Sequence, residues 1–130
     1  EWPAGEYHSC NPLGHIDIEH WADIIVIAPL TANTLTKIAL GLADNYLTCI
    51  FYTWAPARPV IIAPAMNTDM WNNPLTKRHL DELASRYPNL TVIQPIEKRL
   101  ACGDVGIGAM AKIDDIVMAV NEAERRLKRT

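Results

Sequence analysis

The fold is decided by residues 24–34, which read IIVIAPLTANT. The first five residues are apolar, four of them are β-branched, and a proline follows directly. An apolar run without alternation predicts a strand that is buried on both faces, as in a parallel sheet. In residues 31–42 the apolar positions fall on one side of a helix, so the strand is expected to lead into an amphipathic helix.

Strands and helices continue to alternate after this unit. Residues 59–63, PVIIA, repeat the pattern of an apolar run stopped by a proline. The remaining expected elements are a helix at residues 74–87, a short strand at 90–93 and an amphipathic helix at 113–128. Residues 46–54 fit either a strand or a buried helix, and residues 1–14 and 94–111 are expected to be loops.

This alternation predicts an α/β fold with a parallel sheet and helices on both faces. In such sheets, ligands bind outside the carboxyl ends of the strands. Both predicted strands end in Ala-Pro followed by polar residues that include Asn and Thr. The sequence therefore places two polar turns on one edge of the sheet, where a ligand is expected.

Composition limits the class of protein. The chain has 130 residues, 49% of them hydrophobic, which suits one domain with a packed core. A net charge of −3 without a basic stripe argues against nucleic acid as a partner, and no apolar run is long enough to predict a membrane span. The three cysteines are odd in number and widely spaced, and the four histidines lack ligand spacing, so we expect neither a disulfide framework nor a metal site. A cytoplasmic location is expected.

Four features of the sequence can carry chemistry, and each also has a structural explanation. Residues 31–34 offer backbone N–H groups to an anion or a ring edge, or simply cap a helix. Asn67 can donate to a carboxylate, or be an ordinary turn residue. Cys102, in a loop with three glycines, is a candidate proton donor or an idle surface thiol. His15 is a candidate acid–base residue or a surface histidine.

Together these segments resemble the flavin-containing cysteine decarboxylases, a family that includes phosphopantothenoylcysteine decarboxylases and plant halotolerance flavoproteins. Residues 64–71, PAMNTDMW, match the family motif Pro-x-Met-Asn-x-x-Met-Trp at every fixed position. Residues 29–34, PLTANT, resemble Pro-Ala-Ser-Ala-Asn-Thr with two changes. Residues 100–104, LACGD, and 108–111, GAMA, resemble the substrate-covering flap, expected at residues 95–111. The resemblance extends from His15 to the last helix.

The resemblance implies a three-layer, Rossmann-like or flavodoxin-like sheet and a specific reaction. That reaction is FMN-dependent decarboxylation of 4′-phosphopantothenoylcysteine to 4′-phosphopantetheine, a carboxy-lyase step of coenzyme A biosynthesis. It proceeds by oxidation of the substrate thiol, loss of CO2 and re-reduction. The flavin would be contacted by Thr31, Ala32, Asn33, Thr34 and Ala65.

The resemblance also assigns the reacting and substrate-binding residues. His15 would be the base of the oxidative step and Cys102 the acid of the reductive step. Asn67 would bind the departing carboxylate. The phosphopantothenoyl part would be held or covered by Arg99, Ala101 and Met110.

Members of this family begin with a strand and a Gly/Ser-rich turn that holds the flavin phosphate, and nothing before His15 resembles that unit. We therefore expect the N-terminal strand or strands to be missing from this chain and to be supplied by a removed region or a separate fragment. A homotrimer or mixed trimer with FMN at subunit contacts is implied. The alternatives are a phosphatase-binding or mixed-trimer regulatory subunit, a peptide-cysteine decarboxylase, and a flavin-binding module without turnover. The presence of both His15 and Cys102 favours the complete reaction.

Overall fold

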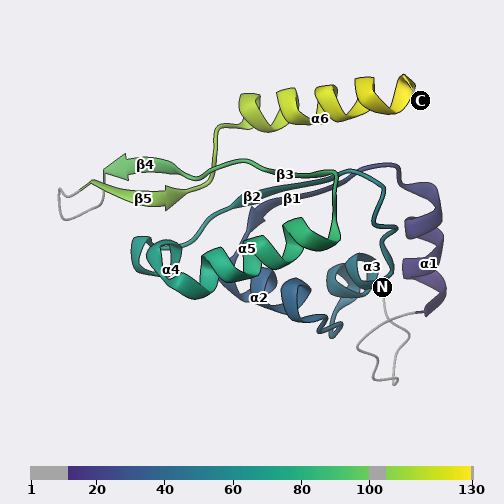
Figure 1. The fold of residues 1–130 in the computed structure, drawn as a ribbon, viewed down its shortest axis with the longest axis horizontal. Coiled ribbons are helices and arrows are strands. Elements are labelled where there is room, and N and C mark those ends of the chain that lie inside the picture. Colours follow the sequence, from purple (N-terminus) through teal and green to yellow (C-terminus); the bar gives the residue numbers. More distant parts are fainter. Residues whose placement is uncertain (1–11, 100–104, 130) are drawn as a thin grey trace.

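The structure, a computed structural model, describes residues 12–99 and 105–129. The helices are α1 (Pro12–Trp21), α2 (Ala32–Leu40), α3 (Tyr46–Thr53), α4 (Thr68–Asn72), α5 (Pro74–Arg86) and α6 (Ile113–Lys128). The strands are β1 (Ile25–Leu30), β2 (Val60–Pro64), β3 (Leu90–Val92), β4 (Ile96–Arg99) and β5 (Val105–Ala109). Figure 1 shows their arrangement.

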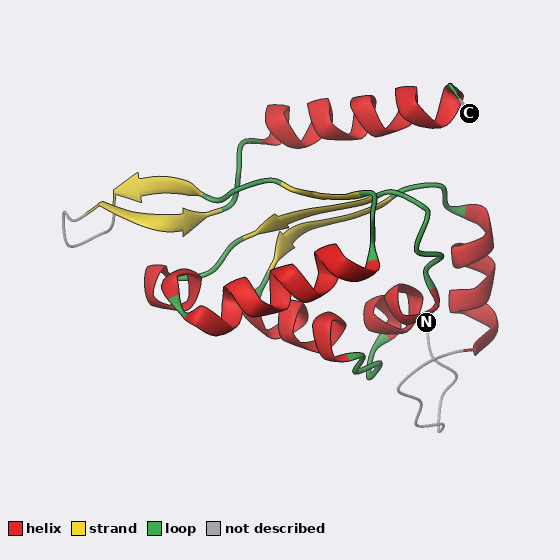
Figure 2. Cartoon of the chain, in the orientation of Figure 1, coloured by secondary structure: helices red, strands yellow, loops and turns green. Residues whose placement is uncertain are grey.

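The centre of the molecule is a three-stranded parallel sheet in the order β1-β2-β3. Every residue of the middle strand β2 is buried, as its uninterrupted apolar sequence predicts. Helices α2, α3 and α5 lie on one face of the sheet, and α6 lies on the other (Figures 1 and 2). The expected three-layer α/β fold with helices on both faces is confirmed.

The core lies between the sheet and the helices α2, α3 and α5. Leu35, Phe51 and Leu83 each come from a different helix and are almost fully buried there. The rings of Phe51 and Tyr87 meet edge to face, with centroids 5.0 Å apart. Burial raises the pKa of the Tyr87 hydroxyl above its ordinary value, while the charge of neighbouring Arg86 opposes this rise.

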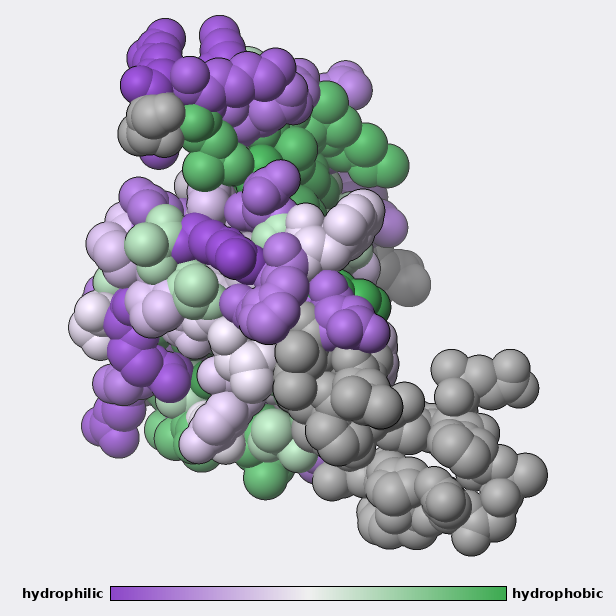
Figure 3. Space-filling model, turned by 90° about the vertical axis from the view of Figure 1, so that its right-hand side faces the viewer, coloured by the Kyte–Doolittle hydropathy of each residue, from purple (hydrophilic) through white to green (hydrophobic). Residues whose placement is uncertain are grey.

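Helix α6 covers the opposite face of the sheet with a narrow apolar side. Ile116 and Ala123 are buried, and in Figure 3 apolar side chains gather beneath this helix while polar ones cover its outer surface. Acidic residues stand in its first turn and basic residues in its last, which suits the helix dipole. The prediction of a closing amphipathic helix at residues 113–128 is therefore confirmed.

Helix α1 is one of the elements that sequence reasoning missed. Residues 12–14 were expected to be part of a loop, but they form its first turn, with Pro12 in the first position. Arg58 holds the end of this helix, because its guanidinium donates to the carbonyl oxygens of Glu19 and Ala22, the latter at 3.1 Å. Its Nη1 also lies 3.4 Å from a carboxylate oxygen of Glu19.

Three other regions either correct a sequence expectation or decide between two of them. Residues 46–54, which fitted a strand or a helix, form α3, because Asn45 and Thr48 make a reciprocal capping box at its start. Residues 94–111 are not simply a loop, since β4 and β5 within them pair as an antiparallel hairpin. Proline did not stop the first strand, which continues through Pro29 to Leu30.

Cys49 is almost fully buried, as expected for a residue in an apolar run, but it is disulfide-bonded, which the spacing of the cysteines did not predict. None of the helices in the described ranges has the length and apolar character needed to cross a membrane. Residues 12–99 and 105–129 contain no cluster of three or more His, Cys, Asp or Glu side chains suited to a metal ion.

Candidate active site

The two polar turns predicted from the sequence lie side by side. Leu30, the last residue of β1, is in register with Pro64, the last residue of β2. The backbone N–H of Ala65 donates to the carbonyl oxygen of Leu30 at 2.9 Å and links the two turns directly. The expectation that both turns share one edge of the sheet is therefore confirmed.

The first turn presents the start of α2. Thr31 is the N-cap, and its hydroxyl accepts a hydrogen bond from the backbone N–H of Thr34 and donates to the Thr34 hydroxyl, both at 3.2 Å. The N–H groups of Ala32 and Asn33 have no acceptor among the described residues. This turn thus offers backbone donors at the positive end of a helix to a group rich in acceptors.

The second turn orients the side chain of Asn67. This residue is the N-cap of α4, and its Oδ1 accepts from the backbone N–H of Met70 at 2.8 Å. The cap fixes which way the amide points, because its acceptor oxygen is used inside the turn. The Nδ2 donor has no acceptor within the described part of the chain, and the side chain is exposed. Asn67 is thereby arranged to donate to an outside acceptor such as a carboxylate.

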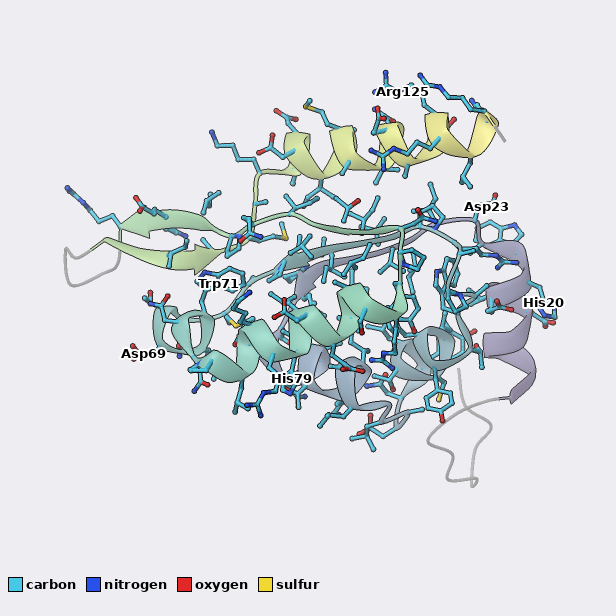
Figure 4. The ribbon with its side chains drawn as sticks, in the orientation of Figure 1. His20, Asp23, Asp69, Trp71, His79 and Arg125 are labelled. Carbon is cyan, nitrogen blue, oxygen red and sulfur yellow. The ribbon has the colours of Figure 1, made fainter. Side chains whose placement is uncertain are left out.

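The hairpin β4–β5 lies against this turn. The N–H of Met66 donates to the carbonyl oxygen of Gly108 at 2.9 Å, and the hydroxyl of Thr68 donates to the carbonyl oxygen of Ile107 at 2.9 Å. Between the hairpin and the turn is an open pocket lined by Met66, Asn67, Thr68, Asp69, Lys98, Gly106, Ile107, Gly108 and Ala109. Figure 4 shows Asp69 and Trp71 on α4, at the same end of the molecule as the hairpin. The pocket places a cationic side chain, that of Lys98, near the Asn67 amide.

Six of the predicted site residues lie on these two joined turns: Thr31, Ala32, Asn33, Thr34, Ala65 and Asn67. Of the other predicted residues, Arg99 is exposed at the end of β4, where it pairs with Val105, and Met110 follows β5 and is half-buried. Ala101 and Cys102 lie outside the described residues.

His15 lies in helix α1, and its side chain is outside the described set. Helix α1 packs on α3 beside the start of β1, at the opposite end of the sheet from α4 and the hairpin (Figure 1). A parallel strand of five residues, such as β2, is about 16 Å long. Within one chain, the structure therefore does not bring α1 to the Asn67 turn.

Sequence reasoning missed three residues of this region: Thr68, Lys98 and Gly108. Thr68 occupies a variable position of the Pro-x-Met-Asn-x-x-Met-Trp motif, so the motif gave no reason to select it. Gly108 was noted only as a loop glycine and as part of the segment that resembles the flap. Two features explain why a glycine stands at this position, its φ of 139° and its close contact with Met66. Both depend on tertiary structure.

A family model described as Flavoprotein matches residues 5–124. The chain belongs to the flavoprotein family. Among curated proteins, this flavoprotein is 57% identical over 114 residues to the phosphopantothenoylcysteine decarboxylase of Arabidopsis thaliana, covering 82% of this chain and 52% of that protein. The chain spans about half the length of several curated relatives that it matches.

Solved structures give the same grouping. One is a phosphopantothenoylcysteine decarboxylase carrying a cysteine-to-serine mutation and complexed with pantothenoylaminoethenethiol. It is 50% identical to this flavoprotein, with a TM-score of 0.78, covering 93% of this chain and 63% of that one. Another is the FMN-binding protein AtHal3, which is 57% identical with a TM-score of 0.73, covering 82% of this chain and 57% of that one.

Proposed function

We propose that this flavoprotein catalyses the FMN-dependent decarboxylation of 4′-phosphopantothenoylcysteine to 4′-phosphopantetheine in coenzyme A biosynthesis. The observation that carries the proposal is the outward amide of Asn67, fixed by its own cap beside the start of α2. The names of its relatives, which include phosphopantothenoylcysteine decarboxylases and an FMN-binding protein, support the same reaction. We further propose that residues 1–130 act as one domain, in the cytoplasm.

The residues of the two turns fit FMN. The N–H groups of Ala32 and Asn33 are donors without a partner among the described residues, and the hydroxyls of Thr31 and Thr34 stand beside them. Ala65 is small and leaves room at the junction of the turns. FMN, when bound, supplies the two-electron acceptor that oxidation of the substrate thiol requires.

The amide of Asn67 suits a carboxylate that is about to leave as CO2. A neutral donor orients the carboxylate, yet it stabilises the negative charge less than a lysine or arginine would. Because that charge disappears from the carboxylate as CO2 forms, strong ground-state stabilisation would oppose the reaction. Asn67 therefore serves as an orienting group, which is the role that the arrangement favours.

The other roles are assigned on the same proposal. Cys102 supplies the proton of the reductive step, and Arg99, Ala101 and Met110 hold or cover the phosphopantothenoyl part of the substrate. His15 acts as the base of the oxidative step. Because α1 lies at the far end of the sheet from Asn67, we propose that His15 serves a neighbouring subunit in a homotrimer or mixed trimer.

The test is Asn67→Asp, which keeps an N-cap oxygen for α4 but replaces the outward donor with a second acceptor. CO2 release from 4′-phosphopantothenoylcysteine should fall at least about tenfold, since a hydrogen bond to a charged group contributes about 1.5–3 kcal/mol. Flavin absorbance and thermal stability should be retained. Asn73→Asp is the matched control, because Asn73 caps α5 in the same way through a 2.9 Å bond to Leu75 N. Normal CO2 release by Asn67→Asp would refute the proposal.

Two variants separate the steps of the reaction. His15→Asn should keep flavin and release little CO2. Cys102→Ser should release CO2 but accumulate the oxidised product, an aminoethenethiol of the kind bound in the related cysteine-to-serine mutant. Normal formation of the final amine by Cys102→Ser would remove Cys102 from the mechanism.

A further inference from the structure

The Asn67 turn is joined to the hairpin on both sides of Asn67. The residue before it, Met66, donates its N–H to Gly108 O, and the residue after it, Thr68, donates its hydroxyl to Ile107 O. Both bonds are 2.9 Å long, and their acceptors are consecutive carbonyl groups of β5. The backbone of Asn67 is thus held between two contacts with a single strand.

The two bonds differ in what they require of the sequence. Any residue except proline at position 66 supplies the backbone donor. The second bond requires a hydroxyl of the right length at position 68, and Thr68 is half-buried, so water competes with this bond less than at an exposed site. The side chain of Thr68 is therefore the sequence-dependent part of the junction.

The hairpin contributes one cationic residue to the pocket that Asn67 lines. Lys98 of β4 lines the pocket with Asn67, and Arg99 follows it at the end of the strand. Strand β5 pairs with β4 along its length, with one register shift between Ile96 and Glu97, so a shift of β5 moves Lys98 relative to the Asn67 amide. The position of β5 on the turn therefore sets the separation between the Asn67 amide and Lys98 of β4.

We propose that Thr68 is a positioning residue, whose hydroxyl holds the hairpin β4–β5 in the position that places Lys98 in the pocket with Asn67. This assignment rests on the proposed function for its effect on catalysis. Its structural part, attachment of the hairpin by the Thr68 hydroxyl, stands on the contacts alone. Thr68 does not touch the reacting atoms, and its loss is expected to weaken substrate binding more than the chemical step.

The test compares Thr68→Val, which keeps the shape and removes the hydroxyl, with Thr68→Ser, which keeps the hydroxyl. Amide hydrogen exchange at Met66 reports attachment of the hairpin, because that N–H is freed when β5 moves away. Thr68→Val should speed this exchange roughly fivefold, which corresponds to about 1 kcal/mol for one hydrogen bond, and Thr68→Ser should restore it. In the active protein, KM for 4′-phosphopantothenoylcysteine should rise severalfold in Thr68→Val with little change in kcat.

Thr53→Val is the matched control. The Thr53 hydroxyl also donates to backbone carbonyls, those of Cys49 and Ile50 at 3.3 and 3.2 Å, but it lies in α3, away from the hairpin. The Thr53→Val substitution should leave amide exchange at Met66 and KM for 4′-phosphopantothenoylcysteine unchanged. Unaltered Met66 exchange in Thr68→Val, or failure of Thr68→Ser to restore it, would overturn the proposal. If the wild-type protein binds no flavin and releases no CO2, the proposed function fails, and the exchange comparison still decides the role of Thr68.

Discussion

Gly108→Ala is expected to detach the hairpin from the Asn67 turn while leaving the core folded. Gly108 has a φ of 139°, a conformation that residues with a Cβ rarely adopt. A Cβ built at this position would lie 2.0 Å from the carbonyl oxygen of Met66. Ordinary contact begins at 3.4 Å, so the two backbones would have to separate by the difference, about 1.4 Å.

That separation exceeds what the junction tolerates. The Met66 N···Gly108 O bond, now 2.9 Å, would be stretched beyond hydrogen-bonding distance. Loss of one hydrogen bond costs about 1 kcal/mol, and a non-glycine residue in a strained backbone region costs about 1–3 kcal/mol. The total of about 2–4 kcal/mol corresponds to a roughly 30- to 700-fold loss in the attached population of the hairpin.

Amide hydrogen exchange at Met66 measures this change, with Ile62 in the buried strand β2 as an internal reference for global unfolding. Gly41→Ala is the control, because Gly41 also has a positive φ, 77°, but its added Cβ would meet only Tyr52 at an ordinary 3.5 Å. The control should lose some global stability without specific exposure of Met66. If Gly108→Ala leaves Met66 exchange within twofold of wild type, the argument from the close approach of the two backbones is wrong.

Two further predictions concern stability. Arg58→Lys should lower the free energy of unfolding by about 1–3 kcal/mol, because a lysine cannot satisfy the carbonyl groups at the end of α1 that the guanidinium now binds. Arg125→Lys is the control, because Arg125 takes part in an exposed ion pair. It should change the free energy of unfolding, measured in urea, by less than about 0.5 kcal/mol. Tyr87→Phe should weaken the loss of stability above about pH 10. The raised pKa of the folded Tyr87 means that the unfolded chain releases its proton first as the pH rises. The contribution of Tyr87 to the free energy of unfolding is therefore constant below the ordinary pKa of 10.0 and falls as the pH rises through it. Identical urea-unfolding curves for wild type and Tyr87→Phe at about pH 11 would contradict this.

The strands and most helices could be predicted from the sequence because their patterns are local. The apolar runs that became β1 and β2 need no partner to be recognised, and each is followed by a turn whose polar residues mark the site edge. Helix α1 escaped prediction because Gly14 and interspersed polar residues obscure its apolar side. The hairpin escaped because β4 is charged and largely exposed, so no alternation marks it as a strand.

The site was predictable in part for the same reason. Asn67 was selected from a contiguous motif, and the structure adds the orientation of its amide, which depends on a hydrogen bond to Met70. The hydrogen bond from Thr68 to Ile107 joins positions 39 residues apart, and only tertiary structure brings them together. Placement of α1 at the opposite end of the sheet from the Asn67 turn likewise follows from topology, not from any local pattern.

The side chain of Asn67 has two different polar atoms: Oδ1 caps a helix, and Nδ2 is left to donate to a ligand at the pocket that this residue lines. A library of variants at this position would therefore sort differently under two kinds of selection. Selection for folding or solubility would accept Asp and Ser together with Asn, since all three are good N-caps. Selection for growth that depends on the decarboxylation product would retain Asn alone among them, so that thermal stability would carry no information on activity at this residue.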